Sequence, residues 1–358
     1  MRGLCVLVML ECHSLILLST RFDQSPLREW LNSVNGLVAP TFILCAGFAL
    51  ALVTVRSGGD AIKRQQRARR SIRRIGQVLG LGLFMRAISW GLLAHPVVWL
   101  WIDILSCIAY SLVMLWVLLF VIRLPARLAP WVFGSLAVAV FAVAPLVMDR
   151  SFGPVLTYFL NNSKMVNSWP LVPWSGYALL GAALGALGAQ SNGRIKLLAG
   201  FGVVVIASCV LTSFDSQLYH AYAPASAYWV LNIGERLKRI GAIGVIFLIV
   251  ERAAHRMPWQ GVNPAARLLE FVSRYSLSAF IVHALLLFGG YGLPSLSLMA
   301  HRFNWPGYWA MVLMLETATI LLCWGFGYVQ QRWAKATPQN VTVAEPAAVD
   351  LPQLQTAR

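Results

Sequence analysis

Long apolar stretches separated by short polar loops dominate this sequence and restrict the folds it can adopt. Most of the stretches are about 16 to 24 residues long, enough for a helix to cross a hydrocarbon layer of about 30 Å. Because the backbone of a segment in lipid must satisfy its own hydrogen bonds, each stretch predicts an α-helix. Ten such stretches are present, at residues 3–19, 37–54, 75–94, 99–122, 129–147, 171–189, 197–212, 240–252, 275–291 and 308–330.

The composition agrees with a chain embedded in lipid, since 58% of the residues are hydrophobic and only 12% are charged. A soluble domain usually carries about 25% charged residues. We therefore expect an all-α, polytopic transmembrane helix bundle of about ten spans within residues 1–335. Residues 336–358 contain three prolines and no apolar periodicity, which predicts a disordered cytoplasmic tail. A signal peptide at the start is the alternative, although Glu11 and His13 interrupt the apolar run.

Positive charge is concentrated in the loops, and the formal net charge is +16. Short basic runs between apolar stretches are typical of membrane loops, so we expect membrane lipids and no nucleic acid as partners. When alternate loops are assigned to opposite sides of the membrane, about 20 of the 29 Lys and Arg residues fall together. The positive-inside rule then places both termini in the cytoplasm.

Ionisable side chains inside the apolar stretches are the main functional candidates, because each costs about 2.5 to 3.5 kcal/mol to insert. They can also be structural, as interhelical hydrogen bonds or as an ion pair of Arg86 with Asp103 or Glu316. No metal-ligand spacing, phosphate loop or dinucleotide-binding glycine pattern is present, so we expect no metal. The candidates are Glu11, His13, Arg86, Asp103, His283 and Glu316.

Arg2 and His13 are eleven residues apart, which predicts that both project from one face of a helix, roughly 16 Å apart. This spacing suits a long anionic donor whose phosphates contact Arg2 and whose reactive end reaches His13. Histidine exchanges protons near neutral pH and can take one from an attacking hydroxyl or amine. The alternative is that Arg2 only orients the helix and His13 is hydrogen-bonded within the bundle.

Four stretches carry a resemblance to a known family: Arg2-Gly3-Leu4 through His13, Asn35-Gly36-Leu37 through Gly47, Asp103-Ile104-Leu105 with Pro173-Trp174-Ser175-Gly176-Tyr177, and Ser276-Leu277 with His283. They resemble bacterial membrane proteins related to heparan-α-glucosaminide N-acetyltransferase. The Arg-x10-His spacing is also similar to that of the acyltransferase 3 family. The histidine that the animal enzyme carries shortly before its Asn-Gly pair has no counterpart at residues 30–34, so the chemistry would use His13.

The resemblance implies an acyltransferase in a bacterial inner membrane, with acyl-CoA such as acetyl-CoA as co-substrate and a glycan or lipid-linked acceptor at the outer side. His13 would be the general base or a transient acyl carrier, and Arg2 a donor-phosphate contact. Asp103, His283 and Arg86 would support the site or contact the acceptor. A secondary transporter or flippase built on Arg86, His283 and Glu316 is the alternative function, followed by a non-catalytic scaffold. A homo-oligomer is compatible with either.

Overall fold

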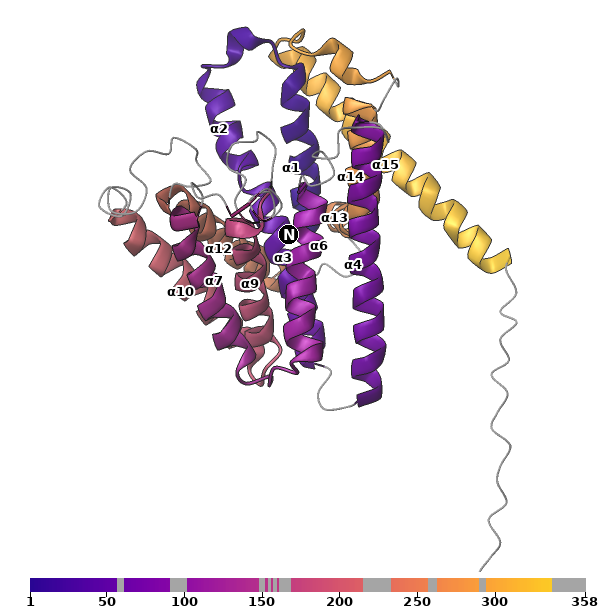
Figure 1. Cartoon of the computed structure of the whole chain (residues 1–358). Helices are drawn as coiled ribbons and strands as arrows, with labels where there is room; N and C mark the ends of the chain where they lie inside the picture. Colours follow the sequence, from indigo (N-terminus) through magenta and orange to yellow (C-terminus); the bar gives the residue numbers. More distant parts are fainter. Residues whose placement is uncertain are drawn as a thin grey trace, which may run out of the picture.

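The computed structural model describes residues 1–56, 61–90, 102–147, 152–153, 156, 160, 169–214, 233–256, 263–289 and 294–336. Across these ranges the chain is helical, and an isolated β-bridge joins Leu18 to Phe303 (Figure 1). The expected all-α architecture is confirmed. The cytoplasmic tail expected at residues 336–358 lies outside the described residues, apart from Ala336 at the end of the last helix.

Each of the ten expected stretches falls on a helix of the described chain, and two short helices, α2 and α13, had not been expected. A π-helical turn, η3 (Val117–Val121), extends α6, and three short 3₁₀ turns lie in connections. The α-helices are α1 (Arg2–Ser14), α2 (Pro26–Asn35), α3 (Val38–Arg56), α4 (Ala61–Trp90), α6 (Ile104–Trp116), α7 (Ala129–Val147), α9 (Leu171–Gly188), α10 (Gly193–Ser213), α12 (Ile233–Arg256), α13 (Pro264–Arg274), α14 (Ser276–Phe288) and α15 (Trp305–Ala336); the 3₁₀ turns are η1 (Leu15–Leu17), η2 (Thr20–Phe22) and η4 (Leu296–Met299).

Five helical segments of the described chain are long and apolar enough to cross a membrane. The pair α13 and α14, bent by 80° at its break, counts as a sixth if it forms one broken span. The expected number of ten spans is therefore not confirmed, and α1 alone has only 13 residues. The five are Pro26–Arg56, Ile104–Val121, Leu171–Gly188, Gly193–Ser213 and Trp305–Gln330.

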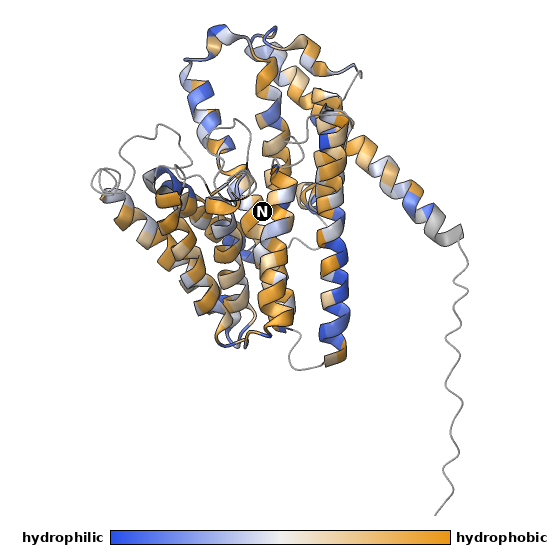
Figure 2. Ribbon diagram, in the orientation of Figure 1, coloured by the Kyte–Doolittle hydropathy of each residue, from blue (hydrophilic) through white to orange (hydrophobic). Residues whose placement is uncertain are grey.

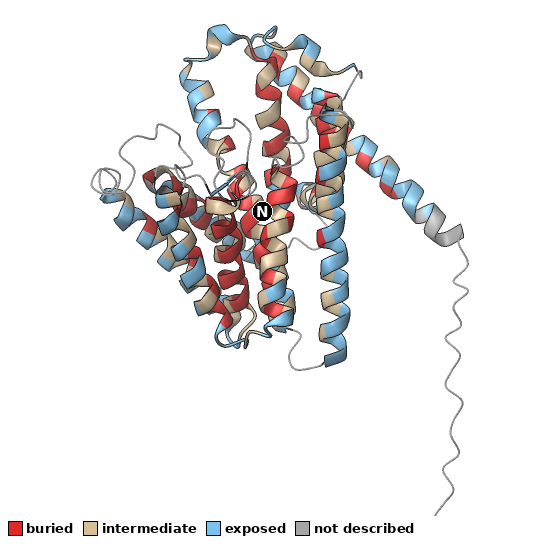
Figure 3. Cartoon of the chain, viewed as in Figure 1, coloured by how far each residue is buried: buried red, intermediate tan, exposed pale blue. Residues whose placement is uncertain are grey.

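Helix α9 lies at the centre of the bundle, and most of its residues are buried (Figure 3). It packs against α3 on one side and α7 on another. Glycines allow the backbones of α3 and α9 to touch: a Cβ on Gly47 would overlap the carbonyl oxygen of Ala178, and one on Gly181 would overlap that of Leu44. Close helix approach at small residues is the usual packing of membrane helices. Gly185 near the end of α9 makes a similar approach, because a Cβ there would overlap the carbonyl oxygen of Phe48.

Several positively charged segments lie at one end of the bundle. Arg56 at the end of α3 donates to the carbonyl of Gly188 at the end of α9, 3.4 Å away. Arg64 near the start of α4 donates to the carbonyl of Leu119 in η3, at 2.7 Å. Figure 2 shows that α4 is polar along this first half and apolar along its second. Positive charge from different loops therefore gathers at one end, and the cytoplasmic orientation of that end remains a prediction.

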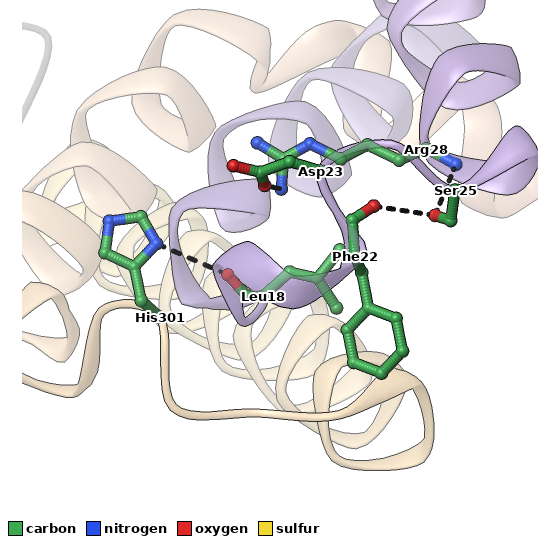
Figure 4. A network of polar contacts seen from close by, with 6 residues as sticks. All are labelled: Leu18, Phe22, Asp23, Ser25, Arg28 and His301. Atoms are coloured by element: carbon green, nitrogen blue, oxygen red, sulfur yellow. Dashed lines mark hydrogen bonds and ion pairs between the residues drawn. The ribbon is translucent and has the colours of Figure 1, made fainter.

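The segment that follows α1 is held against the segment that precedes α15. The backbone nitrogen of Phe303 donates to Leu17 at 3.1 Å, and that of Ser19 donates to Phe303 at 2.9 Å. Figure 4 shows the polar contacts in this region: His301 Nδ1 lies 3.4 Å from the carbonyl of Leu18, and Arg28 pairs with Asp23 at 2.8 Å. These contacts hold residues 17–19, which follow α1, beside residues 301–303, which precede α15.

Candidate active site

A cavity of about 640 Å³ lies between α1, α3, α4, α6 and the break between α13 and α14. Its walls are largely apolar, with Phe42 and Leu50 from α3, Ile75 from α4 and Ile108 from α6 among the lining residues. An apolar pocket with a few converging polar groups is the usual form of a small-molecule site. The cavity is therefore the candidate binding site of this bundle.

Arg2 and His13 both line the cavity, so the shared helix face predicted from their spacing is confirmed. One Nη of Arg2 donates to the carbonyl oxygen of Ser273 at 2.7 Å, near the end of α13. Such a carbonyl lacks a partner within its own helix, and the helix end favours positive charge. Gly3 permits the contact, because a Cβ there would overlap the carbonyl oxygen of Leu269. Arg2 thus has a structural contact as well as a place in the cavity wall.

Two further arginines, Arg74 of α4 and Arg274 at the end of α13, also line the cavity. Arg274 pairs with Glu270 at 3.2 Å on the exposed face of α13. Neither had been singled out from the sequence, because both lie in basic loops or helix ends that the positive-inside rule already explains. For Arg74 the available signal was its spacing from Ser71 and Val78, which place three cavity-lining positions on one face of α4.

His13 contacts His283 of α14 directly. The Nδ1 of His13 lies 2.8 Å from the Nε2 of His283, and the Nδ1 of His283 lies 2.9 Å from the carbonyl oxygen of Ala279. His13 lines the cavity, whereas His283 is fully buried behind it and is not among the lining residues. The structure therefore brings together two of the histidines expected to share a site.

Arg86 and Asp103 form an ion pair at 3.0 Å behind the cavity wall. Arg86 also donates to the hydroxyl of Ser106 at 3.1 Å, and Asp103 accepts from the backbone nitrogen of the same residue at 2.6 Å. Asp103 is thus the N-terminal cap of α6, a position that favours a carboxylate. Neither residue lines the cavity. The pair joins α4 to the start of α6, whose residues Ile104 and Leu105 do line it.

Glu11 lies away from the cavity and accepts a hydrogen bond from the hydroxyl of Tyr308 on α15 at 2.5 Å. Glu11 therefore has the structural role, an interhelical hydrogen bond, that the sequence left open for the buried ionisable residues. Glu316 lies on the same helix α15 and does not line the cavity. Glu11 therefore contributes to the packing of α1 against α15.

Asn35 and Trp169 also line the cavity and were not predicted as site residues. Asn35 ends α2 and belongs to the Asn-Gly pair that carries the family resemblance. The backbone nitrogen of Trp169 donates to Ile102 at 2.8 Å, and its ring lies 4.4 Å from that of Trp174. Within the described chain, no group of three His, Cys, Asp or Glu side chains is placed to hold a metal ion.

A family model described as heparan-alpha-glucosaminide N-acetyltransferase, catalytic, matches residues 1–219, more than half of the chain. The chain belongs to this family of membrane acetyltransferases. No curated protein and no solved structure gives a significant match to it. The matched region contains Arg2, His13 and Arg74, whereas His283 and Arg274 lie beyond it.

Proposed function

We propose that this protein transfers an acetyl or longer acyl group from acyl-CoA to a glycan or lipid-linked acceptor. The family supports acyl transfer as the type of reaction. The observation that carries the proposal is that Arg2 and His13 share one wall of a largely apolar cavity, a cation near the start of α1 and an imidazole three helical turns further along.

The arginines support an anionic donor. Arg2, Arg74 and Arg274 come from three different helices and line the same cavity. Guanidinium groups bind phosphate oxygens through paired, charge-assisted hydrogen bonds. A thioester donor that carries phosphates would be held by these groups, and its uncharged arm would extend along the apolar wall towards His13.

His13 supports the chemistry of the transfer. An acceptor hydroxyl or amine attacks the thioester carbonyl carbon and loses its proton to the imidazole, after which the carbon–sulfur bond breaks and the thiolate leaves. The proton held by His13 then neutralises the thiolate sulfur. A second route, in which the imidazole nitrogen carries the acyl group before the acceptor arrives, uses the same residue.

The expected orientation supports a donor from the cytoplasm. The positively charged end of the bundle faces the cytoplasm by the positive-inside rule, and the acceptor then enters from the outer side of a bacterial inner membrane. The test is to incubate the purified protein with radiolabelled acetyl-CoA and cell-envelope extract. Label transferred to an envelope glycan or lipid supports the proposal, and consumption of acetyl-CoA no faster than in protein-free extract contradicts it.

A further inference from the structure

Two hydrogen bonds connect the backbone of α14 to the cavity through His283 and His13. Which atom donates in each bond follows from the carbonyl at the end of this chain. The carbonyl oxygen of Ala279 can only accept, so the Nδ1 of His283, 2.9 Å away, must carry a proton. A neutral imidazole carries one ring proton, which leaves the Nε2 of His283 as an acceptor. The orientation of this ring is therefore set by a backbone group that cannot change its role.

The same reasoning fixes the proton on His13. Its Nδ1 lies 2.8 Å from the Nε2 of His283, an acceptor, so the Nδ1 of His13 must donate. The opposite tautomer would place two lone pairs against each other across this contact. The ring planes differ by only 9° and the centroids are 5.1 Å apart, as expected for two rings joined edge to edge by one hydrogen bond.

We infer that His283 is a positioning residue that holds neutral His13 with its proton on Nδ1 and its lone pair on Nε2, the nitrogen left for substrate in the cavity. The inference rests on the proposed acyl transfer for its purpose and on the hydrogen-bond chain for its geometry. Histidine bases in other enzymes are oriented in the same way, by an acceptor on the nitrogen remote from the substrate.

The aromatic surroundings keep other partners away from the pair. Phe288 lies edge-on to His13 with its ring centroid 5.8 Å away, and Phe280 lies edge-on to His283 at 5.5 Å. In the described part of the chain, no carboxylate forms an ion pair with either ring. The proton on the Nδ1 of His13 thus has an imidazole as its partner, where many enzymes have an aspartate.

The path of the reaction proton follows from this chain. The acceptor's proton moves to the Nε2 of His13, and the resulting imidazolium keeps its Nδ1 proton directed at His283, which shares the positive charge. The Ala279 carbonyl cannot take up a proton, so the chain does not carry the proton away into the bundle. The proton returns from Nε2 to the thiolate sulfur as the thiol leaves, and both rings regain their starting state.

The tautomer is measurable by NMR on the full chain in lipid nanodiscs, with ¹⁵N-labelled histidine and assignment by His13→Ala. We expect a protonated Nδ1 and an unprotonated Nε2 for neutral His13. Replacing His283 with Phe removes the acceptor but keeps a ring of similar shape. We expect that variant to lose the single tautomer and to lower kcat roughly 10-fold or more, less than the 10² to 10⁴ expected for loss of the base itself. The KM for acetyl-CoA should change less than twofold.

Two comparisons make the result specific. His283→Gln retains a side-chain carbonyl as acceptor and should restore part of both the tautomer and kcat. His255→Phe is the control, because His255 is exposed near the end of α12 and does not line the cavity. An Nε2-protonated His13 in the unmodified protein, or an unchanged tautomer in His283→Phe, would overturn the inference. The spectrum reports on it even if acyl transfer is absent, so failure of the proposed function is distinguishable.

Discussion

The Nδ1 of His13 and the Nε2 of His283 are 2.8 Å apart, although 270 residues separate them in the chain. His13 lies on α1 and within the part that matches the acetyltransferase family, whereas His283 lies on α14 and outside it. Arg2 makes a parallel connection, since it donates to Ser273 beside the α13–α14 break. The site is therefore assembled from both ends of the chain, and α13 and α14 complete what the matched region begins.

Arg2 is expected to bind the donor's phosphates. Replacing it with Gln should raise the KM for acyl-CoA roughly 10-fold or more, since a charged hydrogen bond contributes about 1.5 to 3 kcal/mol. Lys should recover only part of the loss, because an ammonium lacks the guanidinium fork. The KM values for acyl-CoA and for the acceptor are measured for each variant, together with the amount of membrane-inserted protein. An unchanged donor KM in the Gln variant, with less inserted protein, would leave Arg2 only its contact with Ser273.

Arg74 and its neighbour Arg73 form a matched pair for testing the cavity. Both are exposed cations on α4, and only Arg74 is among the residues that line the cavity. Arg74→Gln should raise the donor KM several-fold, because it removes a guanidinium from the expected phosphate site. Arg73→Gln removes the same charge from the same helix and should leave that KM within twofold. Equal effects of the two substitutions would indicate general electrostatic attraction of the donor rather than a contact.

The helices were largely predictable from the sequence, and their contacts were not. Apolar length placed a helix at each of ten stretches, and the spacing of Arg2 and His13 placed both on one face, because such patterns depend on neighbours along the chain. The number of spans is not confirmed, because hydropathy alone does not show that α1 has only 13 residues or that a break at Tyr275 bends the chain by 80°. The roles of Asp103 and His283 depend on partners on other helices, which no local pattern contains.

Close packing of α3 against α9 predicts a strong effect of a side chain at Gly181. Gly181→Val would force its Cβ into the backbone of α3 at Leu44, and overpacking of this kind costs about 1 to 3 kcal/mol or more. We expect a lower unfolding temperature and less protein in detergent. Gly202→Val on α10 is the control, since a Cβ at Gly202 meets no atom within 4 Å. Similar unfolding temperatures for the two variants would contradict the close approach of α3 and α9.

The orientation of the bundle is testable with cysteines at its two ends. Gln65 lies in the basic first half of α4, and Gln24 lies in the connection between α1 and α2, at the opposite end of the molecule (Figure 1). In spheroplasts, a membrane-impermeant maleimide should label Gln24→Cys and should label Gln65→Cys only after lysis, relative to the unmodified chain. The reverse pattern would place the positively charged end on the outer side and contradict a cytoplasmic donor.

A transporter or flippase makes different demands on the same bundle. Its proposed pathway used Arg86, His283 and Glu316, yet none of these lines the cavity, and Arg86 is bound to Asp103 and Ser106. A transport pathway requires ionisable groups that face a water-filled passage. The arrangement of the described residues therefore favours chemistry at His13 over movement of a substrate past Arg86.

The most direct test of acyl transfer at this cavity is the rate of label transfer from radiolabelled acetyl-CoA to envelope acceptors by His13→Ala. Loss of the base should lower kcat about 10² to 10⁴-fold. The amount of inserted protein should stay near that of the unmodified chain, because His13 lies against an open cavity. His255→Ala, assayed in parallel, should retain full activity, because His255 is exposed near the end of α12 and does not line the cavity. A His13→Ala rate within threefold of the unmodified protein would contradict the account and remove His13 from the mechanism.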